Sequence, residues 1–379
     1  MKPRTKLHVG DLVEVRSKGE ILQTLDGNGQ IEGMPFMPEM FAFCGRRFRV
    51  YKSAHKTCDY SVYPFHSRRL TRTVHLETRC DGQAHGGCQA GCLLYWKYDW
   101  LKLISEDSLG KTSQRVESSQ PPDRSCNPRP GCSEDVVWRN VLTTQKIGDT
   151  PRYSCQTTEI PRAASPLAWW NLRQYAEDCF SGNVSPRRIL NGLVYWLYYS
   201  LSQAGIGVGR PMRWLYNKIC PLFGGTLFPR KVGLVPRGQQ TPSIKLNLQP
   251  GELVRVKSHV EILKTVGTDG KNRGMYWDAE LVPYCDQTYK VLRNVSKLIS
   301  EQTGEMKEMK SPCIVLDNVV CQARYSSCRY FCPKGMYPFW HEIWLERVQP
   351  ENANPAVLIE TSGVTSEKGL DHICIRNLS

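Results

Sequence analysis

Cysteines at similar spacings in two parts of the chain are the residues best suited to chemistry. The spacings are Cys-x7-Cys-x3-Cys from Cys80 to Cys92 and Cys-x6-Cys-x3-Cys from Cys321 to Cys332. One more cysteine precedes each set at matching positions, and four thiolates suit tetrahedral zinc or an iron-sulfur cluster. We therefore predict two metal sites. Their ligands would be Cys44, Cys80, Cys88 and Cys92 in the first site, and Cys285, Cys321, Cys328 and Cys332 in the second.

The metal itself has three interpretations. Two structural zinc ions are favoured over an iron-sulfur cluster because the x3 spacing is typical of zinc ligands. Without any metal, the shared cysteines would be buried as small apolar side chains. Alternate ligands are His85, Cys58 and Cys313, although none of them is shared by both sets. Cys126 and Cys132 are expected to join neither site.

Three further residues are weak catalytic candidates. Cys155 follows Arg152, whose positive charge could lower a thiol pKa, so it is either a nucleophile or a buried or spare metal-ligating thiol. Glu39 and Glu280 each lie five residues before the shared cysteine. They could orient a metal ligand or act as a base, or they could form a turn cap or a salt bridge.

Four arginines, interleaved with aromatic residues, could bind nucleic acid or another anionic polymer. The alternative is a solvated surface. These residues are Arg46, Arg47, Arg68 and Arg69. A phosphate-binding P-loop motif is absent, and His341-Glu342 lacks the second histidine of a zincin motif because Leu345 occupies that position.

An internal repeat must position the cysteines. Residues 10–52 and 251–293 align without a gap at an offset of 241, and 15 of the 43 aligned pairs are identical. Apolar alternation and Asp-Gly or Asn-Gly turns predict short strands in each copy. The expected fold class is α+β, with two homologous small SH3-like β-barrels bridged by a helical segment.

Five regions follow from this repeat. They are a first cysteine-rich module at 1–108, a Pro/Ser-rich linker at 109–150, a helical aromatic-rich bridge at 151–244, a second module at 245–350 and a tail at 351–379. In the bridge, Ser185 and Pro186 predict the start of a helix that continues to Gln203. The uncharged stretch 189–209 could dock between the barrels, lie at a membrane interface or span a bilayer.

Composition limits the cellular setting. The 379 residues include sixteen cysteines and have a formal net charge of +14, which permits attraction to nucleic acid or anionic lipid. Residues 1–20 show neither an apolar segment nor a cleavage site typical of a signal peptide. We therefore expect a cytoplasmic location, with membrane association as an alternative. The cytoplasm is reducing, and thiols there bind metal more often than they form disulfides.

Several segments together resemble a family of uncharacterised bacterial proteins that share the two-copy arrangement. They are GDLVEVRSKGEIL, GMPFMPEM, FCGRRFRVYK, RCDGQAHGGCQAGC and LNLQPGELVRVKS. The resemblance covers most of the chain outside the linker and the tail. It implies a bacterial cytoplasmic origin and assigns no catalytic residues.

The favoured function is that of a metal-stapled binding or accessory protein that docks a protein partner or an anionic polymer such as nucleic acid. Two alternatives stay open. One is a metal- or thiol-dependent enzyme with its site between the two modules. The other is a peripheral membrane protein that binds through the helix at 187–209.

Overall fold

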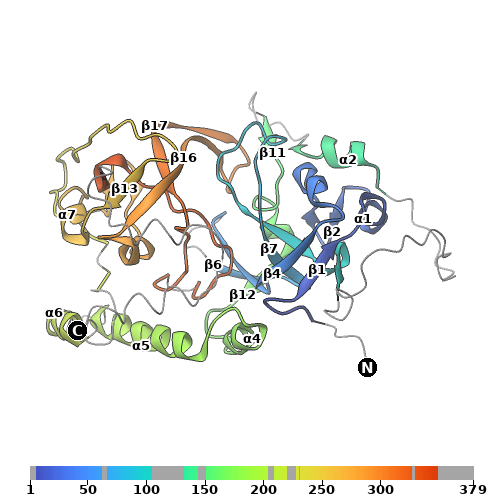
Figure 1. Cartoon of the computed structure of the whole chain (residues 1–379). Helices are drawn as coiled ribbons and strands as arrows, with labels where there is room; N and C mark the ends of the chain where they lie inside the picture. The colour runs from blue at the N-terminus through green and yellow to red at the C-terminus, as the bar shows by residue number, and fades with distance from the viewer. Residues whose placement is uncertain are drawn as a thin grey trace. The chain divides into compact units, whose positions relative to one another are not determined.

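The computed structural model describes residues 6–61, 66–104, 132–143, 151–203, 209–219, 228–229, 231–326 and 329–348. These residues form both helices and strands, which confirms the mixed composition of the predicted fold (Figure 1). The SH3-like barrels stay a prediction. The predicted tail at 351–379 and most of the predicted linker, including Cys126, lie outside the described residues.

The chain packs as two compact units. Unit 1 comprises Met1–Leu190, Val295–Ser311 and Gln322–Tyr337, and unit 2 comprises Asn191–Asn294, Pro312–Cys321 and Pro338–Ser379. The two units are defined by how the chain packs, whereas the five predicted regions are defined by the sequence repeat. The two divisions are not equivalent, so the predicted regions stay a prediction.

A five-stranded antiparallel sheet forms the centre of unit 1. Its strand order is β8 (Leu93–Lys97), β7 (Thr73–Arg79), β4 (Arg47–Ser53), β1 (Leu12–Val15) and β9 (Leu101–Leu103). Val13 in β1 lies opposite Phe48 on one side and Leu103 on the other. Val13 and Val15 are fully buried while their neighbours are partly exposed, so alternation along β1 directs one face into the core.

Smaller elements surround this sheet. Strands β12 (Ser165–Leu167), β6 (His66–Arg69) and β5 (Lys56–Asp59) form a three-stranded sheet, and β2 (Gln30–Ile31) pairs with β3 (Met34–Pro35), as β10 (Leu142–Thr143) does with β11 (Arg152–Tyr153). The helices are α1 (Lys18–Thr24), α2 (Glu134–Arg139), α3 (Ile160–Ala163) and α4 (Arg173–Ser181), with 3-10 turns η1 (Pro38–Phe43) and η2 (Tyr98–Trp100).

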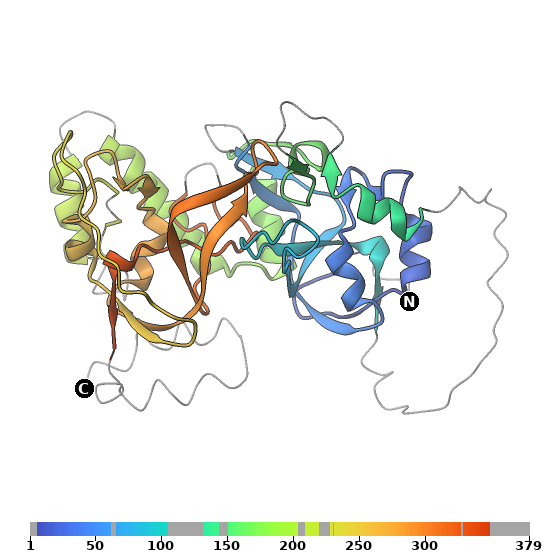
Figure 2. The same cartoon turned by 90° about the horizontal axis from the view of Figure 1, so that it is seen from above.

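Unit 2 is built on a four-stranded sheet. Its order is β17 (Met306–Leu316), β16 (Thr288–Ile299), β13 (Leu253–Val256) and β18 (Leu345–Arg347). Figure 2 shows β16 and β17 as two long neighbouring strands, and each contributes residues to both units. The unit also contains α7 (His259–Leu263), β14 (Lys271–Asn272), β15 (Met275–Tyr276), η5 (Ala279–Tyr284) and η6 (Glu342–Trp344).

The same type of helix cap occurs in both units, at positions that are 241 residues apart. Helix α1 begins at a capping box in which the Glu20 carboxylate accepts from Ser17 N at 2.9 Å, and α7 begins with the equivalent pair, Glu261 and Ser258, at 3.0 Å. Such a box satisfies backbone N–H groups that a helix start leaves unpaired. Ser17 and Ser258, and likewise Glu20 and Glu261, are therefore identical at positions where each caps a helix. A duplication of the whole module stays a prediction.

Each unit has its own aromatic core. Phe36 and Trp100 meet edge to face at 5.1 Å in unit 1, and Trp277 meets Trp344 at 5.3 Å in unit 2. All four side chains are at most 2% exposed. Large rings packed this way bury much apolar area, which stabilises two separate cores.

Two further helices are α5 (Pro186–Gln203) and α6 (Gly209–Ile219). Helix α5 confirms the predicted helix that ends at Gln203. Among the helices of the described residues, none is both long enough and apolar enough to cross a bilayer.

Candidate metal centre

The loop between β7 and β8 is a compact structure that carries Cys80, His85, Cys88 and Cys92. Cys80 N donates to Cys92 O at 2.9 Å and closes the base of the loop. Inside it, the backbone N–H groups of His85 and Gly87 both donate to Gly82 O, at 3.0 and 2.9 Å. Gly82 has φ +72°, and a Cβ there would lie 1.9 Å from Cys88 O. The loop geometry therefore requires glycine at this position.

Three side chains with metal-binding atoms converge beside this loop. Glu39 from η1 meets Cys80 and His85, and their ligand atoms all lie within 4.8 Å of one another. His85 Nδ1 is 2.6 Å from Glu39 Oε1, and Cys80 Sγ is 3.8 Å from the same oxygen. The side chains of His85 and Glu39 are 2% and 5% exposed. This is the one such group of three or more that the described part of the chain contains.

Backbone contacts fix the orientation of the His85 ring. His85 Nε2 lies 3.1 Å from Ser154 O, and because a carbonyl oxygen can only accept, Nε2 carries the proton. The other nitrogen, Nδ1, then faces a carboxylate oxygen at 2.6 Å. The second oxygen, Glu39 Oε2, is buried and has no hydrogen-bond partner among the described residues. Two buried acceptors this close must share a cation, either a proton or a metal ion.

Other thiols border the group. Burial, and then the negative charge of Glu39, raises the pKa of Cys80 far above its usual range, and Cys92 and Cys155 contribute to the same shift. Burial also raises the pKa of Cys92 to about 12, with contributions from Glu301 and Cys155. Burial likewise raises the pKa of Cys155, whose Sγ lies 3.2 Å from the Thr157 hydroxyl. Cys155 is thus a buried thiol, and its roles as nucleophile or metal ligand stay predictions.

The remaining predicted ligands of the first site are not part of this group. Cys44 ends η1 and packs against the core, and burial raises its pKa. Cys88 Sγ accepts from Ile299 N at 3.4 Å. Cys132 is a core residue, 8% exposed. The structure therefore brings together one predicted thiolate, one alternate ligand and one weak catalytic candidate, Glu39.

The second predicted set is divided between the compact units. Cys285, Cys313 and Cys321 belong to unit 2 and Cys332 to unit 1, while Cys328 lies outside the described residues. Cys332 Sγ accepts from Cys58 N at 3.1 Å, and the two thiols hydrogen-bond each other. Glu280, the counterpart of Glu39, is buried in unit 2 at 5% exposure. The second four-thiolate site stays a prediction.

The four arginines proposed for polyanion binding have partners within unit 1. Arg47 pairs with Glu14 at 3.0 Å, Arg68 with Asp59, and Arg69 with Glu177 at 2.6 Å. Arg46 lies over the rings of Phe43 and Phe48. Because Arg68 and Arg69 are mostly buried in these pairs, their placement favours a structural role.

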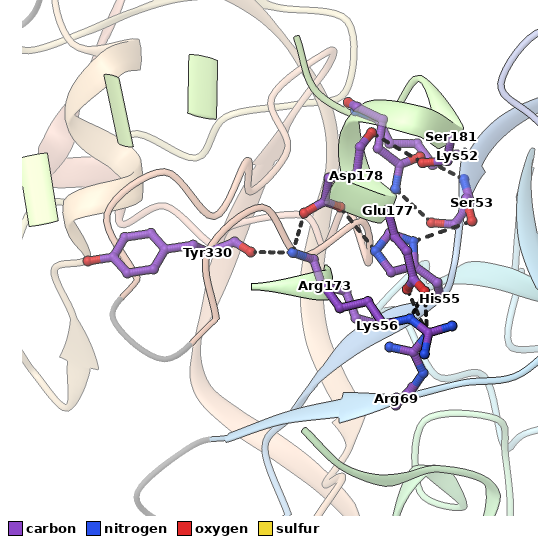
Figure 3. A network of polar contacts seen from close by, with 11 residues as sticks. Lys52, Ser53, His55, Lys56, Arg69, Arg173, Glu177, Asp178, Ser181 and Tyr330 are labelled. Carbon is purple, nitrogen blue, oxygen red and sulfur yellow. Dashed lines mark hydrogen bonds and ion pairs between the residues drawn. The ribbon is translucent and has the colours of Figure 1, made fainter. Parts of the chain in front are cut away.

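A second polar cluster in unit 1 was not predicted from the sequence. Lys56 Nζ donates to Asp178 Oδ2 at 2.5 Å and to Tyr330 O at 2.8 Å, and His55 Nε2 lies 3.2 Å from Asp178 Oδ1 (Figure 3). The Lys56 and Asp178 side chains are 1% and 0% exposed. Nothing in the local sequence marks this lysine as buried, because its partners are far away along the chain.

These buried contacts hold the segment Gln322–Tyr337 in unit 1. Besides Tyr330 and Cys332, it contributes Lys334, whose Nζ donates to both oxygens of Glu301 at 2.8 Å. Lys334 is 2% exposed, and Glu301 raises its pKa against the effect of burial. Two buried lysines, each paired with a carboxylate, therefore secure a segment that the repeat assigned to the second module.

Comparisons of the chain with models of protein families, with curated proteins and with solved structures found no match.

Proposed function

We propose that unit 1 binds one zinc ion through Glu39, Cys80 and His85. The observation that carries the proposal is the orientation of His85, whose Nε2–H is directed to Ser154 O so that Nδ1 faces the carboxylate and the thiol. Histidines that bind metals commonly donate their other ring N–H to a carbonyl or carboxylate in this way.

The donor types suit zinc, and so does the separation of the thiol from the carboxylate. Imidazole nitrogen, thiolate and carboxylate are its usual ligands, and tetrahedral bond lengths place a sulfur and an oxygen ligand roughly 3.6 Å apart. The observed separation between Cys80 Sγ and Glu39 Oε1 is 3.8 Å. The His85 Nδ1 to Oε1 separation of 2.6 Å would have to widen to about 3.3 Å. A rotation of the Glu39 carboxylate could supply this change, because its second oxygen has no hydrogen-bond partner within the part of the chain that the structure describes.

A fourth ligand would have to come from outside this group, because no further Cys, His, Asp or Glu of the described residues has a ligand atom within 4.8 Å of all three. We name Cys92 and Cys155 as the candidates, since their charges act on Cys80. With a thiolate from either one, the ion would be fully coordinated by protein, as in structural zinc sites. It would then connect η1, the β7–β8 loop and the segment around Ser154. A metal-stapled accessory or binding protein is the function that this arrangement supports best.

Metal analysis tests the proposal. Full-length protein purified under reducing conditions should contain one equivalent of zinc at this site. His85→Leu and Cys80→Ser should lose it, whereas Cys132→Ser, a matched change of a buried thiol outside the group, should retain it. Absence of metal from the wild type, or retention of zinc by both site variants, would refute the proposal. If the analysis instead found iron together with inorganic sulfide, the protein would hold an iron-sulfur cluster and the zinc proposal would be refuted.

The broader predictions from the sequence are not needed for this proposal. A second zinc ion, the cytoplasmic location, the docking of a protein or anionic polymer and an enzymatic activity all stay predictions.

A further inference from the structure

Helix α5 exposes a continuous stripe of aliphatic side chains. The members lie at positions i, i+3, i+4, i+7 and i+11, which places them on one face of a helix. They are Leu190, Leu193, Val194, Leu197 and Leu201, with exposed fractions of 59, 57, 57, 53 and 41%. Single exposed leucines are ordinary on a protein surface, whereas four leucines and a valine on one helix face form a patch that indicates an interaction site.

The opposite face of α5 already has its packing partners. Tyr198 contacts Tyr216 of α6 at a ring distance of 4.9 Å, and Tyr195 packs near Phe228 at 6.2 Å. Tyr195 is only 6% exposed. Aromatic side chains thus join α5 to α6, and the aliphatic stripe is not used by this packing.

The charge of this segment indicates what the stripe binds. Residues 186–219 contain no Asp or Glu, and their five basic residues give a formal charge of +5. They are Arg187, Arg188, Arg210, Arg213 and Lys218. Trp214 of α6 is 63% exposed, and tryptophan favours the boundary between lipid headgroups and acyl chains. Aliphatic residues combined with cations and no anions are typical of helices that lie on anionic membranes.

We propose that α5 binds the surface of an anionic lipid bilayer, with its aliphatic stripe between the acyl chains and with exposed basic residues such as Arg187 and Lys218 near lipid phosphates. Arg188 is half-buried and donates to Gln322 Oε1 at 2.9 Å, so it is not counted among them. The helix would lie parallel to the membrane plane. An 18-residue helix is about 27 Å long, and its other face is occupied by the aromatic contacts with α6 and Phe228.

Vesicle co-sedimentation of the full chain tests the proposal. We expect binding to vesicles that contain phosphatidylglycerol, weaker binding to phosphatidylcholine alone, and a decrease with added salt. Leu193→Ser combined with Leu197→Ser should lower the partition coefficient about a hundredfold, because two leucines would no longer be buried in lipid. Arg187→Gln with Arg213→Gln should reduce binding to anionic vesicles only.

A matched control changes two exposed leucines elsewhere, Leu103→Ser and Leu142→Ser, which are 43 and 51% exposed. That variant should bind vesicles as the wild type does. Thermal melting should show that all variants are folded, since the altered leucines and Arg187 are exposed and Arg213 is only half-buried. The proposal is overturned if the wild type does not sediment with anionic vesicles at low salt, or if the Leu193/Leu197 variant binds equally well. It is also overturned if light scattering shows that the stripe instead joins two copies of the chain.

Discussion

Lys56 and Asp178 form a fully buried ion pair between residues that are 122 positions apart in the sequence, with Nζ 2.5 Å from Oδ2. The lysine also donates to Tyr330 O and lies 5.0 Å from the centre of the Tyr175 ring. Burial lowers the pKa of Lys56, and the negative charge of Asp178 counteracts this effect. The pair therefore joins β5, α4 and the segment Gln322–Tyr337 at one point.

Removing only the lysine should destabilise the protein strongly. Lys56→Met leaves the Asp178 carboxylate buried without its ammonium partner, which typically costs about 3–5 kcal/mol of the free energy of unfolding. The double variant Lys56→Met with Asp178→Leu should recover much of this loss, since apolar side chains can replace a buried ion pair. Urea unfolding measures both values, and a Lys56→Met variant as stable as the wild type would contradict the prediction.

His75 should make the stability of unit 1 depend on pH. Complete burial lowers the pKa of this histidine from 6.5 to about 4, and Nδ1 lies 2.8 Å from Leu94 O. Below about pH 6.5 the unfolded chain binds a proton that the folded chain does not, so stability falls as the pH decreases towards 4. The full effect of a shift of this size is about 3 kcal/mol.

His75→Gln provides the comparison, because the amide can still donate to Leu94 O but does not titrate. The quantity to compare is the slope of the free energy of unfolding between pH 6.5 and 4, which removes any constant cost of the substitution. The variant should have the shallower slope. Equal slopes would show that His75 is protonated in the folded state as readily as in the unfolded state.

Local sequence signals predicted the parts of the fold that depend on nearby residues. The start of α5 at Pro186 was predicted from Ser185 and Pro186, which lie within one helical turn. The capping pairs Ser17–Glu20 and Ser258–Glu261 are equally local, but they were not among the predictions. The spacing of Cys80, Cys88 and Cys92 also predicted a metal-binding loop, and metal binding there stays a prediction. Glu39 was suspected only because its counterpart, Glu280, occupies the same position in the repeat.

Long-range pairing could not be predicted in this way. Ser154 O orients His85 from 69 residues away, and Lys56 meets Tyr330 across 274 residues. One sequence contains no signal for such contacts, because they depend on how separate segments pack. The repeat also suggested that Cys332 would be grouped with Cys285, whereas Cys332 packs with Cys58 in unit 1. The spacing of cysteines along the sequence thus identifies possible metal ligands, but it does not show which of these side chains lie close together in the fold.

Gly82 should be essential to the conformation of the β7–β8 loop. Gly82→Ala introduces a Cβ that would lie 1.9 Å from Cys88 O and 2.8 Å from its carbonyl carbon, in addition to the strain of φ +72°. Gly45 is a matched control, since its φ is +73° but a Cβ there would have nothing within 4 Å. Gly45→Ala should cost only about 1 kcal/mol of stability, and Gly82→Ala about 3 kcal/mol or more.

The two glycine variants are compared by thermal melting and by zinc content. The predicted pattern is that Gly82→Ala lowers both while Gly45→Ala leaves the zinc content unchanged. If the two variants had equal stability, the close approach of Gly82 to Cys88 would not constrain the loop.

Removal of the metal should destabilise the protein through the proposed site. A chelator that extracts zinc leaves His85 and Glu39 to share a proton at 2.6 Å, and the ion's contribution to folding is lost. The wild type should therefore melt at a lower temperature after chelation and recover when zinc is restored. His85→Leu, which lacks the nitrogen ligand, should melt at the same temperature with and without chelator, while Cys132→Ser should respond as the wild type does. A chelator effect of equal size in His85→Leu would place the stabilising ion elsewhere in the chain.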